Sequence, residues 1–381
     1  MQNNISYWEK HSFLSEYDVI VVGSGIVGLC AALNLKLQAP KWKIGILEAG
    51  FLPGGASTKN AGFACFGSVS ELLDELKSTP EDELMTVVEM RWKGLLKLKE
   101  TVGEAAIDYK QLGGYEIFRK KDSESFSECA DSIHYLNRQI KNIVGVPDIY
   151  AVANERIAGF GFKDVNSMIV NRCEAQIDTG KMMSALLEKV AGTGVKVFNN
   201  CRVLKIEDTG EYQLLKTNQG YFSAKRILIA TNAFARELFP QLDVIPGRGQ
   251  VLVTGEMSGL RINGTFHYDK GYYYFRNINN RILLGGGRNI DFKSEETIEP
   301  GITSSVQLAL EELLYQIIIP DQRPQIDYRW SGVMGFGDKL KPIIEEIQPA
   351  VFCAVRCNGM GVAMGSVTGQ KAADLVLQTD I

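Results

Sequence analysis

A nucleotide-binding pattern near the start of the chain constrains the fold more than any other feature. Residues 18–28 read DVIVVGSGIVG, an apolar strand that leads into three glycines with the G-x-G-x-x-G spacing. Gly23 permits a tight turn, Gly25 lets the backbone approach a pyrophosphate, and Gly28 allows the following helix to pack closely on the strand. The free N–H groups of that helix, which begins near Ile26, then point at the phosphates.

A carboxylate completes the pattern. Residues 43–47 form a second apolar run, and Glu48 ends it twenty positions after Gly28. An acid at the end of the second strand accepts hydrogen bonds from the ribose hydroxyls of a dinucleotide. Because the strand, glycine turn, helix, second strand and acid occur in this order, residues 18–48 are expected to bind a dinucleotide through a β-α-β unit.

Composition sets the broad class of the protein. The chain has 381 residues, of which 45% are apolar and 23% charged, an ordinary balance for a globular protein large enough for two domains. Glycine occurs 38 times, above the usual ~7%, so sites of close backbone packing are expected. The net charge of −4 provides no electrostatic footprint for nucleic acid or an anionic membrane, and neither is expected as a partner.

Cysteine and histidine usage indicates the compartment and argues against a metal. Seven scattered cysteines, an odd number, are typical of a reduced cytoplasmic protein rather than a disulfide framework. With three histidines in the chain, no Cys/His metal site is expected. Residues 1–17 do not resemble a signal peptide, and no apolar run approaches the ~20 residues of a membrane span. The sequence therefore predicts a cytoplasmic protein.

Periodicity along the rest of the chain predicts a mixed fold. Helices are expected over 69–77, 80–103, 122–142, 178–190, 301–317 and the end of the chain to 377, and strands over 195–198, 203–207, 212–217, 227–230, 249–256, 271–276, 281–287 and 351–355. A pattern similar to that of the nucleotide-binding β-α-β unit occurs again near 195–233 and at 351–377. This order predicts an α/β, Rossmann-like domain built from separated segments, with an α+β second domain around an antiparallel sheet.

Five segments together resemble one group of flavoproteins. They are the β-α-β unit 18–48, STKNAG at 57–62, RILIATNA at 226–233, the hairpin 272–288 and NGMG at 358–361. On these segments the chain resembles the D-amino-acid-oxidase-like superfamily, which includes glycine oxidase, sarcosine oxidase and gamma-glutamylputrescine oxidase, over nearly all of 17–377. The resemblance implies an FAD-binding domain over 17–80, 160–235 and 325–381, and a substrate-binding domain over 81–159 and 236–324.

The resemblance also implies which residues surround FAD. The expected contacts are Gly23, Gly25, Ile26, Gly28, Glu48, Ala49, Ser57, Thr58, Lys59, Asn60, Ala61, Val197, Val203, Thr231, Asn232, Gly359, Met360, Gly361 and Val362. The loop 358–361 opens a helix whose N–H groups favour negative charge, and in this family such a loop faces the flavin pyrimidine ring. A plain tight turn is the alternative for this loop, and an ordinary strand valine is the alternative for Val197.

The chain departs from its relatives in informative ways. Sarcosine oxidases hold FAD through a cysteine, but this chain has none between Cys201 and Cys353, so non-covalent FAD is expected. Leu283 stands where sarcosine oxidases carry an oxygen-activating lysine. Met334 lies two residues after a Trp-Ser-Gly sequence, in the region where glycine oxidase carries a carboxylate-binding arginine. Neither the oxygen-activating lysine nor the carboxylate-binding arginine is therefore expected at the matching position of this chain.

Lys59, Arg276 and His267 are the candidate catalytic residues. In relatives, the segment of Lys59 passes beside the flavin ring, where a cation assists oxygen activation or binds phosphate; a solvated loop lysine is the alternative. His267 neighbours a run of tyrosines at 272–274, so it is expected either to line the substrate side or to lie on the surface of a strand. Cys65, close to Lys59 in the chain, is expected to be a small buried hydrophobe.

Arginines and one tyrosine are the candidate substrate residues. Arg248, Arg276 and Arg288 come from the expected second sheet, and each is either a bidentate anchor for a carboxylate or phosphate or a structural ion-pair partner. Arg356 falls near an arginine position of glycine-oxidase-like enzymes. Tyr274 lies in a strand whose side chains alternate, so one face packs and the other meets a ligand.

Taken together, the residues and the resemblance predict an FAD-dependent amine or amino-acid oxidase or dehydrogenase. It would oxidise the CH–NH bond of a small molecule to an imine, with hydride transfer to flavin N5 and oxygen or another acceptor taking the electrons. The alternative is a flavin oxidoreductase that modifies the carboxymethylaminomethyl group of a tRNA wobble uridine, although the net acidity argues against it. A non-enzymatic flavoprotein with structural FAD is a third possibility.

Overall fold

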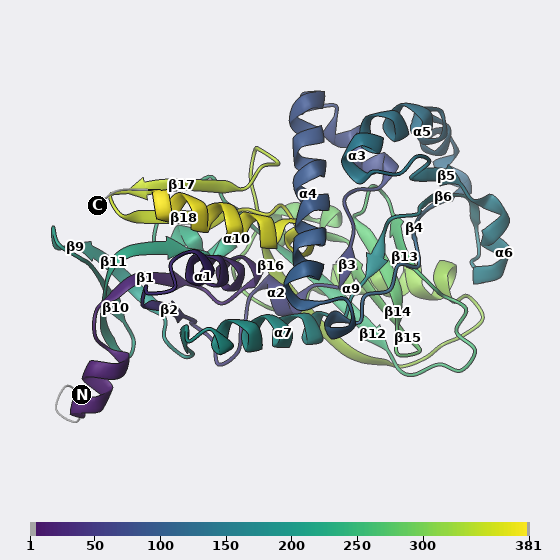
Figure 1. Cartoon of the computed structure of the whole chain (residues 1–381). Helices are drawn as coiled ribbons and strands as arrows, with labels where there is room; N and C mark the ends of the chain where they lie inside the picture. Colours follow the sequence, from purple (N-terminus) through teal and green to yellow (C-terminus); the bar gives the residue numbers. More distant parts are fainter. Residues whose placement is uncertain (1–4, 379–381) are drawn as a thin grey trace.

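The computed structural model describes residues 5–378, and two large sheets organise it (Figure 1). The first has the order β17-β18-β11-β1-β2-β8, formed by β17 (Ile343–Gln348), β18 (Val351–Val355), β11 (Gly220–Ile229), β1 (Tyr17–Val22), β2 (Ile44–Leu47) and β8 (Lys196–Phe198). The strands from β18 to β8 are parallel, and β17 is an antiparallel edge. This arrangement confirms the expected Rossmann-like core. Residues 19–22 of β1 are buried, as expected of a strand covered on both faces.

Helices cover one face of this sheet. They are α1 (Ile26–Gln38), α7 (Thr179–Gly192) and α10 (Gly361–Gln378), whose apolar side chains share one core with β1 and β2. The opposite face packs a second apolar cluster, to which β9 (Val203–Asp208) and β10 (Gln213–Thr217), an antiparallel extension of β11, contribute. The nucleotide-binding strand β1 therefore lies in the middle of a three-layer arrangement.

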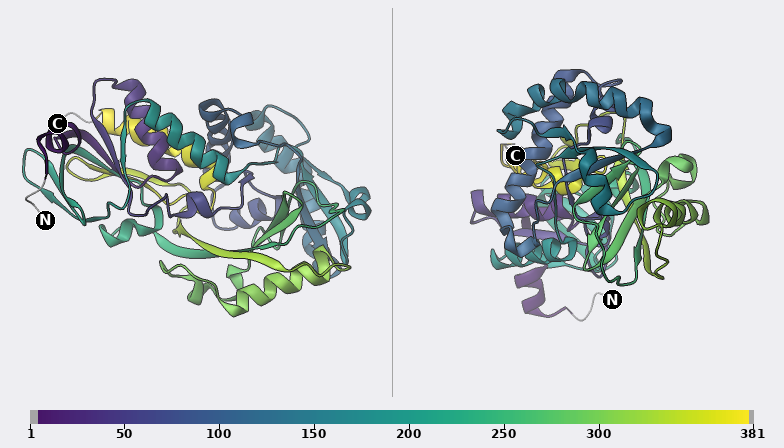
Figure 2. Two further views of the ribbon diagram at one scale, coloured as in Figure 1. Left: turned by 90° about the horizontal axis from the view of Figure 1, so that it is seen from below. Right: turned by 90° about the vertical axis from the view of Figure 1, so that its right-hand side faces the viewer.

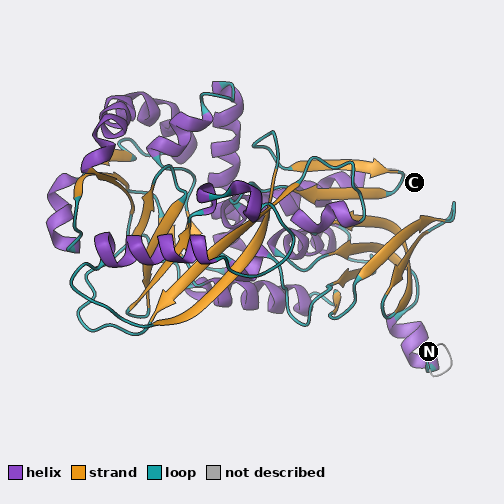
Figure 3. Cartoon of the chain, turned by 180° about the vertical axis from the view of Figure 1, so that it is seen from behind, coloured by secondary structure: helices purple, strands orange, loops and turns teal. Residues whose placement is uncertain are grey.

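The second sheet is largely antiparallel, with the order β16-β12-β15-β14-β13-β4-β6-β5 (Figure 3). Its strands are β16 (Ile326–Phe336), β12 (Ile245–Thr254), β15 (Arg281–Gly286), β14 (Tyr273–Ile278), β13 (Thr265–Tyr268), β4 (Gly114–Arg119), β6 (Val165–Asn171) and β5 (Tyr150–Val152). Helix α9 (Ser304–Leu313) packs on β12 and β15, below the long green strands in the left view of Figure 2. Helices α3 (Val69–Glu75) and α5 (Ser123–Val144) share an apolar cluster with β4, β5 and β6.

Short elements connect these layers. They are β3 (Phe63–Ala64), β7 (Ala175–Gln176), α2 (Ala56–Lys59), α6 (Ile157–Phe160), α8 (Phe292–Glu295), the 3-10 turns Ala105–Ile107, Lys120–Asp122, Asn154–Arg156, Asn232–Glu237 and Arg288–Ile290, and the π-type turns Glu9–Phe13 and Leu314–Ile318. None of the helices within residues 5–378 combines the length and apolar character needed to cross a membrane.

Glycines allow helices to meet backbone to backbone around α10. A Cβ atom on Gly369 would lie 2.6 Å from the carbonyl oxygen of Val27 in α1. On the other side stands the long helix α4 (Glu81–Val102), upright in Figure 1, where a Cβ on Gly94 would lie 2.0 Å from the carbonyl oxygen of Ala363. The Oγ of Ser366 donates a hydrogen bond to the carbonyl oxygen of Gly94 at 2.6 Å. These contacts place the start of α10 beside the start of α1.

The domain boundaries stay a prediction, and three elements pair or pack across them. Strand β6, expected within the FAD-binding segment 160–235, pairs with β4 in the second sheet. Strand β16, expected within 325–381, pairs with β12 in that sheet along nearly its whole length. Helix α4, expected within the substrate segment 81–159, packs against α10. Strand pairing and helix docking are long-range interactions, so local composition did not reveal them.

Substitution of Gly94 by alanine is expected to destabilise the protein by about 1–3 kcal/mol, because the added methyl group overlaps the backbone of α10. The midpoint of thermal unfolding measures this effect. Gly192→Ala is the matched control: this helical glycine has no atom within 4 Å of a built Cβ, so the change is expected to be neutral or slightly stabilising. Equal midpoints for the two variants would show that α4 does not depend on backbone contact with α10.

Candidate functional site

A cavity of about 770 Å³ extends from the glycine turn after β1 to the second sheet. At its nucleotide end it is lined by Gly23, Gly25 and Glu48, and at its far end by Tyr274 and Arg288. Residues of both sheets therefore share one continuous space. Its shape suits an extended cofactor whose reactive end meets a second molecule at the second sheet.

The turn after β1 has the geometry of a phosphate site. Gly23 has φ +102°, a conformation that favours glycine. A Cβ on Gly28 would lie 2.0 Å from the carbonyl oxygen of Gly23, so the helix can begin only where a glycine allows it. The N-cap of α1 is Gly25, which has no side chain to cap the helix, and the amide of Ile26 donates to the Oγ of Ser57 at 3.0 Å. The remaining amides of the first turn are available to an anion.

Glu48 holds this turn together. Its Oε2 accepts hydrogen bonds from the backbone N–H and the Oγ of Ser24, at 3.0 and 2.7 Å, and its Oε1 accepts from the amide of Gly50 at 2.9 Å. The side chain is buried, yet it lines the cavity at the end of β2. The carboxylate therefore ties β2 to the glycine turn while it remains positioned for a ribose.

Most of the expected cofactor residues line the cavity. These are Gly23, Gly25, Ile26, Glu48, Ala49, Ser57, Lys59, Asn60, Ala61, Val203, Thr231, Asn232, Gly359, Met360, Gly361 and Val362. Gly28, Thr58 and Val197 do not. Gly28 packs against the turn, Thr58 donates its hydroxyl to the carbonyl oxygen of Pro53 at 2.5 Å, and Val197 packs against the helix-side core.

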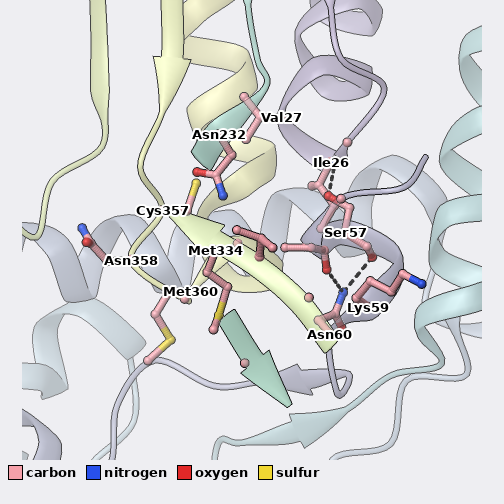
Figure 4. Close-up of a pocket in the computed structure, with 18 of the residues that line it drawn as sticks. Ile26, Val27, Ser57, Lys59, Asn60, Asn232, Met334, Cys357, Asn358 and Met360 are labelled. Atoms are coloured by element: carbon pink, nitrogen blue, oxygen red, sulfur yellow. Dashed lines mark hydrogen bonds between the residues drawn. The ribbon is translucent and has the colours of Figure 1, made fainter. Parts of the chain in front are cut away.

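The loop before α10 lies across the cavity from α1. A Cβ on Gly359 would lie 3.8 Å from both the sulfur of Met334 and the ring of Phe336 in β16. In the close-up, Met334 and Met360 point into the same region (Figure 4). The first residues of α10, 361–363, line this region of the cavity. Two helix N-termini, those of α1 and α10, thus face the same space.

Lys59 lies in the segment that crosses the cavity, but its ammonium group extends away from Met334 and Met360 (Figure 4). Its carbonyl oxygen accepts a hydrogen bond from the Nε1 of Trp330 at 2.9 Å, which ties α2 to the second sheet. The backbone and the first side-chain atoms of Lys59 therefore shape the wall, and the cationic tip is directed elsewhere.

Three of the four candidate arginines have structural partners and do not line the cavity. Arg248 forms a bidentate ion pair with buried Glu295 at 2.8 and 3.1 Å. Arg356 pairs with Asp243 and donates to the carbonyl oxygen of Lys341 at 2.9 Å. Arg276 donates to the carbonyl oxygens of Ala61 and Ile177 at 2.6 and 2.9 Å, and burial lowers its pKa to about 10. The ion pairs and hydrogen bonds of these arginines give them structural roles, and such long-range partners could not be identified from the sequence.

Arg288 is the candidate arginine that lines the cavity. Its guanidinium stacks on Phe336 with 3.8 Å to the ring centroid and lies 5.1 Å from the ring of Phe292. Within residues 5–378 it makes no hydrogen bond or ion pair, and burial lowers its pKa below the ordinary arginine value. It is therefore oriented by aromatic rings and free to bind an anionic group.

His267 also lines the cavity and is buried. Its Nε2 hydrogen-bonds the Oε1 of Glu174 at 2.5 Å, and the ring meets Phe63 edge-on at 5.3 Å between centroids. Tyr274 stands opposite His267 across the β13–β14 ladder, and burial raises its pKa to about 12. The surface-strand alternative for His267 is therefore wrong.

The sequence analysis did not predict the carboxylates that line the far end of the cavity. Glu71, Asp74 and Glu75 of α3 line it. Burial, with the negative charge of Glu75, raises the pKa of Glu71 to about 7, although Arg91 opposes this shift. A short polar helix after a glycine-rich stretch carries no local signal of such a role. Glu174, the partner of His267, also followed no recognisable motif.

A model of the DAO family, described as FAD dependent oxidoreductase, matches residues 18–375. The chain belongs to this family. It is an FAD-dependent oxidoreductase, and the geometry agrees: a glycine turn with a free helix N-terminus, a ribose-side carboxylate and a long cavity suit FAD. When FAD is bound, Glu48 and the amides of α1 would hold its nucleotide half. Residues 59–61 and the loop before α10 would hold its flavin half.

Similar proteins have low sequence identity to this chain but align with it over most of their length. The probable oxidoreductase OrdL of Rhizobium meliloti (strain 1021) is 24% identical and covers 94% of this chain and 83% of its own length. The glycine oxidase of Geobacillus kaustophilus (strain HTA426) is 23% identical over 94% of this chain and 93% of its own. The crystal structure of glycine oxidase from that species has a TM-score of 0.75 at 19% identity and covers 96% of both chains. The structure of L-proline dehydrogenase from P. horikoshii also has a TM-score of 0.75, at 18% identity, and covers 96% of this chain and 94% of its own.

Replacement of Glu48 by alanine is expected to weaken FAD binding about tenfold to a hundredfold. The variant loses hydrogen bonds to a buried charged group, worth about 1.5–3 kcal/mol, and loosens the glycine turn. Titration of the apoprotein with FAD, followed by flavin fluorescence, measures the affinity. Glu207→Ala, on exposed β9, serves as the control and should bind FAD like the wild type. Unchanged affinity in Glu48→Ala would remove this carboxylate from the cofactor site.

Proposed function

We propose that the protein oxidises the CH–NH bond of a small amino acid or amine to an imine, which water then hydrolyses. The observation that carries this proposal is the continuous cavity, which joins the nucleotide turn to a chamber walled by the second sheet. In this chamber lies Arg288, which has no ion-pair partner among residues 5–378. FAD, when bound, supplies the acceptor for the hydride from the substrate carbon. Oxygen or another acceptor then takes the electrons.

The chain's own residues orient the substrate and exclude water. Arg288 would bind a carboxylate through its guanidinium, which Phe336 holds in place. Tyr274, Met334 and Phe63 give the chamber apolar walls. Since hydride transfer requires a C–H bond held in a dry, fixed geometry, these side chains supply the positioning on which the reaction depends. Arg276 acts indirectly, because its hydrogen bond fixes the carbonyl oxygen of Ala61.

The names of relatives support an amino acid as the first substrate to test. Similar proteins are named glycine oxidase and L-proline dehydrogenase. The alternative of a tRNA-modifying enzyme has less support from the cavity, because Glu71, Asp74 and Glu75 stand at its far end and would repel a phosphate backbone. We also propose a cytoplasmic location, supported by seven buried cysteines that form no disulfide.

FAD is expected to be bound without a covalent bond. Cys357 is the cysteine nearest the flavin-side loop, but burial raises its pKa to about 12, so it is a poor nucleophile. Precipitation of the holoprotein with acid should therefore give a colourless pellet and a yellow supernatant. A pellet that stays yellow after washing would contradict this prediction.

Anaerobic mixing with glycine, N-methylglycine, L-proline, D-alanine and putrescine tests the function directly. At least one of these compounds should bleach the flavin absorbance of the holoenzyme. For a carboxylated substrate, Arg288→Met is expected to raise the apparent dissociation constant about tenfold to a hundredfold, because a charged hydrogen bond is lost. Arg281→Met, which removes a surface ion pair with Asp327, is the matched control. No bleaching by any amine would count against the proposed reaction.

A further inference from the structure

His267 has one ring nitrogen engaged and the other free. Its Nε2 forms a 2.5 Å hydrogen bond with Oε1 of Glu174, whereas Nδ1 forms none with any residue from 5 to 378. The ring is 6% exposed, and it lines the large cavity at the end where the second sheet bounds it. Phe63, edge-on at 5.3 Å, restricts its rotation. The ring is therefore held in a fixed place in the cavity wall, with Nδ1 as its unengaged nitrogen.

Glu174 determines which nitrogen is free. The carboxylate is buried, and Oε1 also accepts a hydrogen bond from the Oγ1 of Thr265 at 2.9 Å. Its Oε2 has no hydrogen-bond partner in the described part of the chain. A carboxylate can only accept, so the neutral ring must place its proton on Nε2 and leave a lone pair on Nδ1. A carboxylate that orients a histidine base in this way recurs in hydrolytic enzymes.

We propose that Nδ1 of His267 accepts the proton that the substrate ammonium must lose before oxidation, and that Glu174 is the positioning residue that keeps this nitrogen bare. The inference rests on the proposed function. In this step an N–H bond of the ammonium breaks, its electron pair stays on the amine nitrogen, and a new N–H bond forms at Nδ1. The products are a neutral amine, ready to lose hydride, and an imidazolium paired with Glu174. No oxidant is consumed in the transfer.

The surroundings of the ring favour this exchange. The charged and titratable groups around it come from several elements. They are Glu174 before β7, Glu71 on α3, Glu116 on β4, Tyr150 on β5, Tyr274 on β14, Cys65 after β3 and Lys270 after β13, with Arg91 on α4 behind Glu71. Burial by itself lowers the pKa of His267, but the carboxylates of Glu174, Glu71 and Glu116 raise it to about 8. The ring is therefore protonated below pH 8 and becomes a proton acceptor above it.

The pH dependence of flavin reduction tests the step. With an amine that bleaches the flavin, the rate at a fixed substrate concentration should rise about tenfold from pH 7 to a plateau above pH 8, as one group of pKa about 8 loses its proton. Glu174→Gln removes the charge that raises the pKa of His267 but keeps an acceptor oxygen. The rising limb of the pH–rate profile of this variant should therefore move to lower pH. A purely structural role for Glu174 would leave the limb at its wild-type position.

Replacement of His267 should remove this limb and lower the plateau rate about 10²-fold or more. His134→Asn, on the exposed face of α5, is the matched control and should keep both. Without His267 the amine must lose its proton before it binds, so the rate of the variant should instead follow the ionisation of the free substrate ammonium. A His267→Asn enzyme with the wild-type limb and plateau would overturn the proposal.

Nuclear magnetic resonance of the holoenzyme with ¹⁵N-labelled histidine provides a test that needs no substrate and no change to His267. His11→Asn and His134→Asn assign the remaining signals. The neutral ring of His267 should carry its proton on Nε2, and its titration should shift to lower pH in Glu174→Gln. A proton on Nδ1 in the neutral ring would overturn the inference. If none of the amines bleaches the flavin, the proposed function fails, and the tautomer still decides whether the acceptor exists.

Discussion

The contact of α10 with α1 and α4 is the constraint on which the site depends. Gly94 and Gly369 allow these helices to approach until side chains would overlap the neighbouring backbone. As a result the N-terminus of α10 is brought to the same cavity as the N-terminus of α1, although some 335 residues separate Ile26 from Gly361. Two helix N-termini then face one space, which suits a cofactor that carries a pyrophosphate in its middle and, at one end, a ring that gains negative charge.

The second sheet contributes a different environment. Arg276 of β14 and Trp330 of β16 hydrogen-bond to carbonyl oxygens at 59–61, so the second sheet holds this segment of the cavity wall at two points. Beyond it lies a chamber in which Arg288 is held by aromatic rings and His267 by a carboxylate. Cationic and acidic groups therefore stand at different places in one cavity. A zwitterionic amino acid, with a carboxylate and an ammonium group, complements this division.

Partner availability separates the arginines that the sequence could not distinguish. Arg248 and Arg356 have buried or nearby carboxylates, and Arg276 has two carbonyl oxygens, so each is satisfied within the chain. Within residues 5–378, Arg288 contacts the faces of two aromatic rings and forms no hydrogen bond or ion pair. A guanidinium without an anionic partner inside a cavity is costly unless a ligand completes it, and this difference supports the proposed role of Arg288 as the substrate anchor.

The sequence by itself determined the nucleotide half of this protein. The strand, the three glycines and Glu48 are local in the chain, and each has one conformational or hydrogen-bonding role that a reader can assign from residue type and spacing. The superfamily and the Rossmann-like core followed from such segments, and most of the residues expected around the cofactor line the cavity. The tertiary structure decided the substrate half. The pairing of β6 and β16 with the second sheet, the partner of each arginine and the meeting of His267 with Glu174 all join residues far apart in the chain. Their roles depend on what each side chain contacts, and contact between distant segments leaves no local pattern to read.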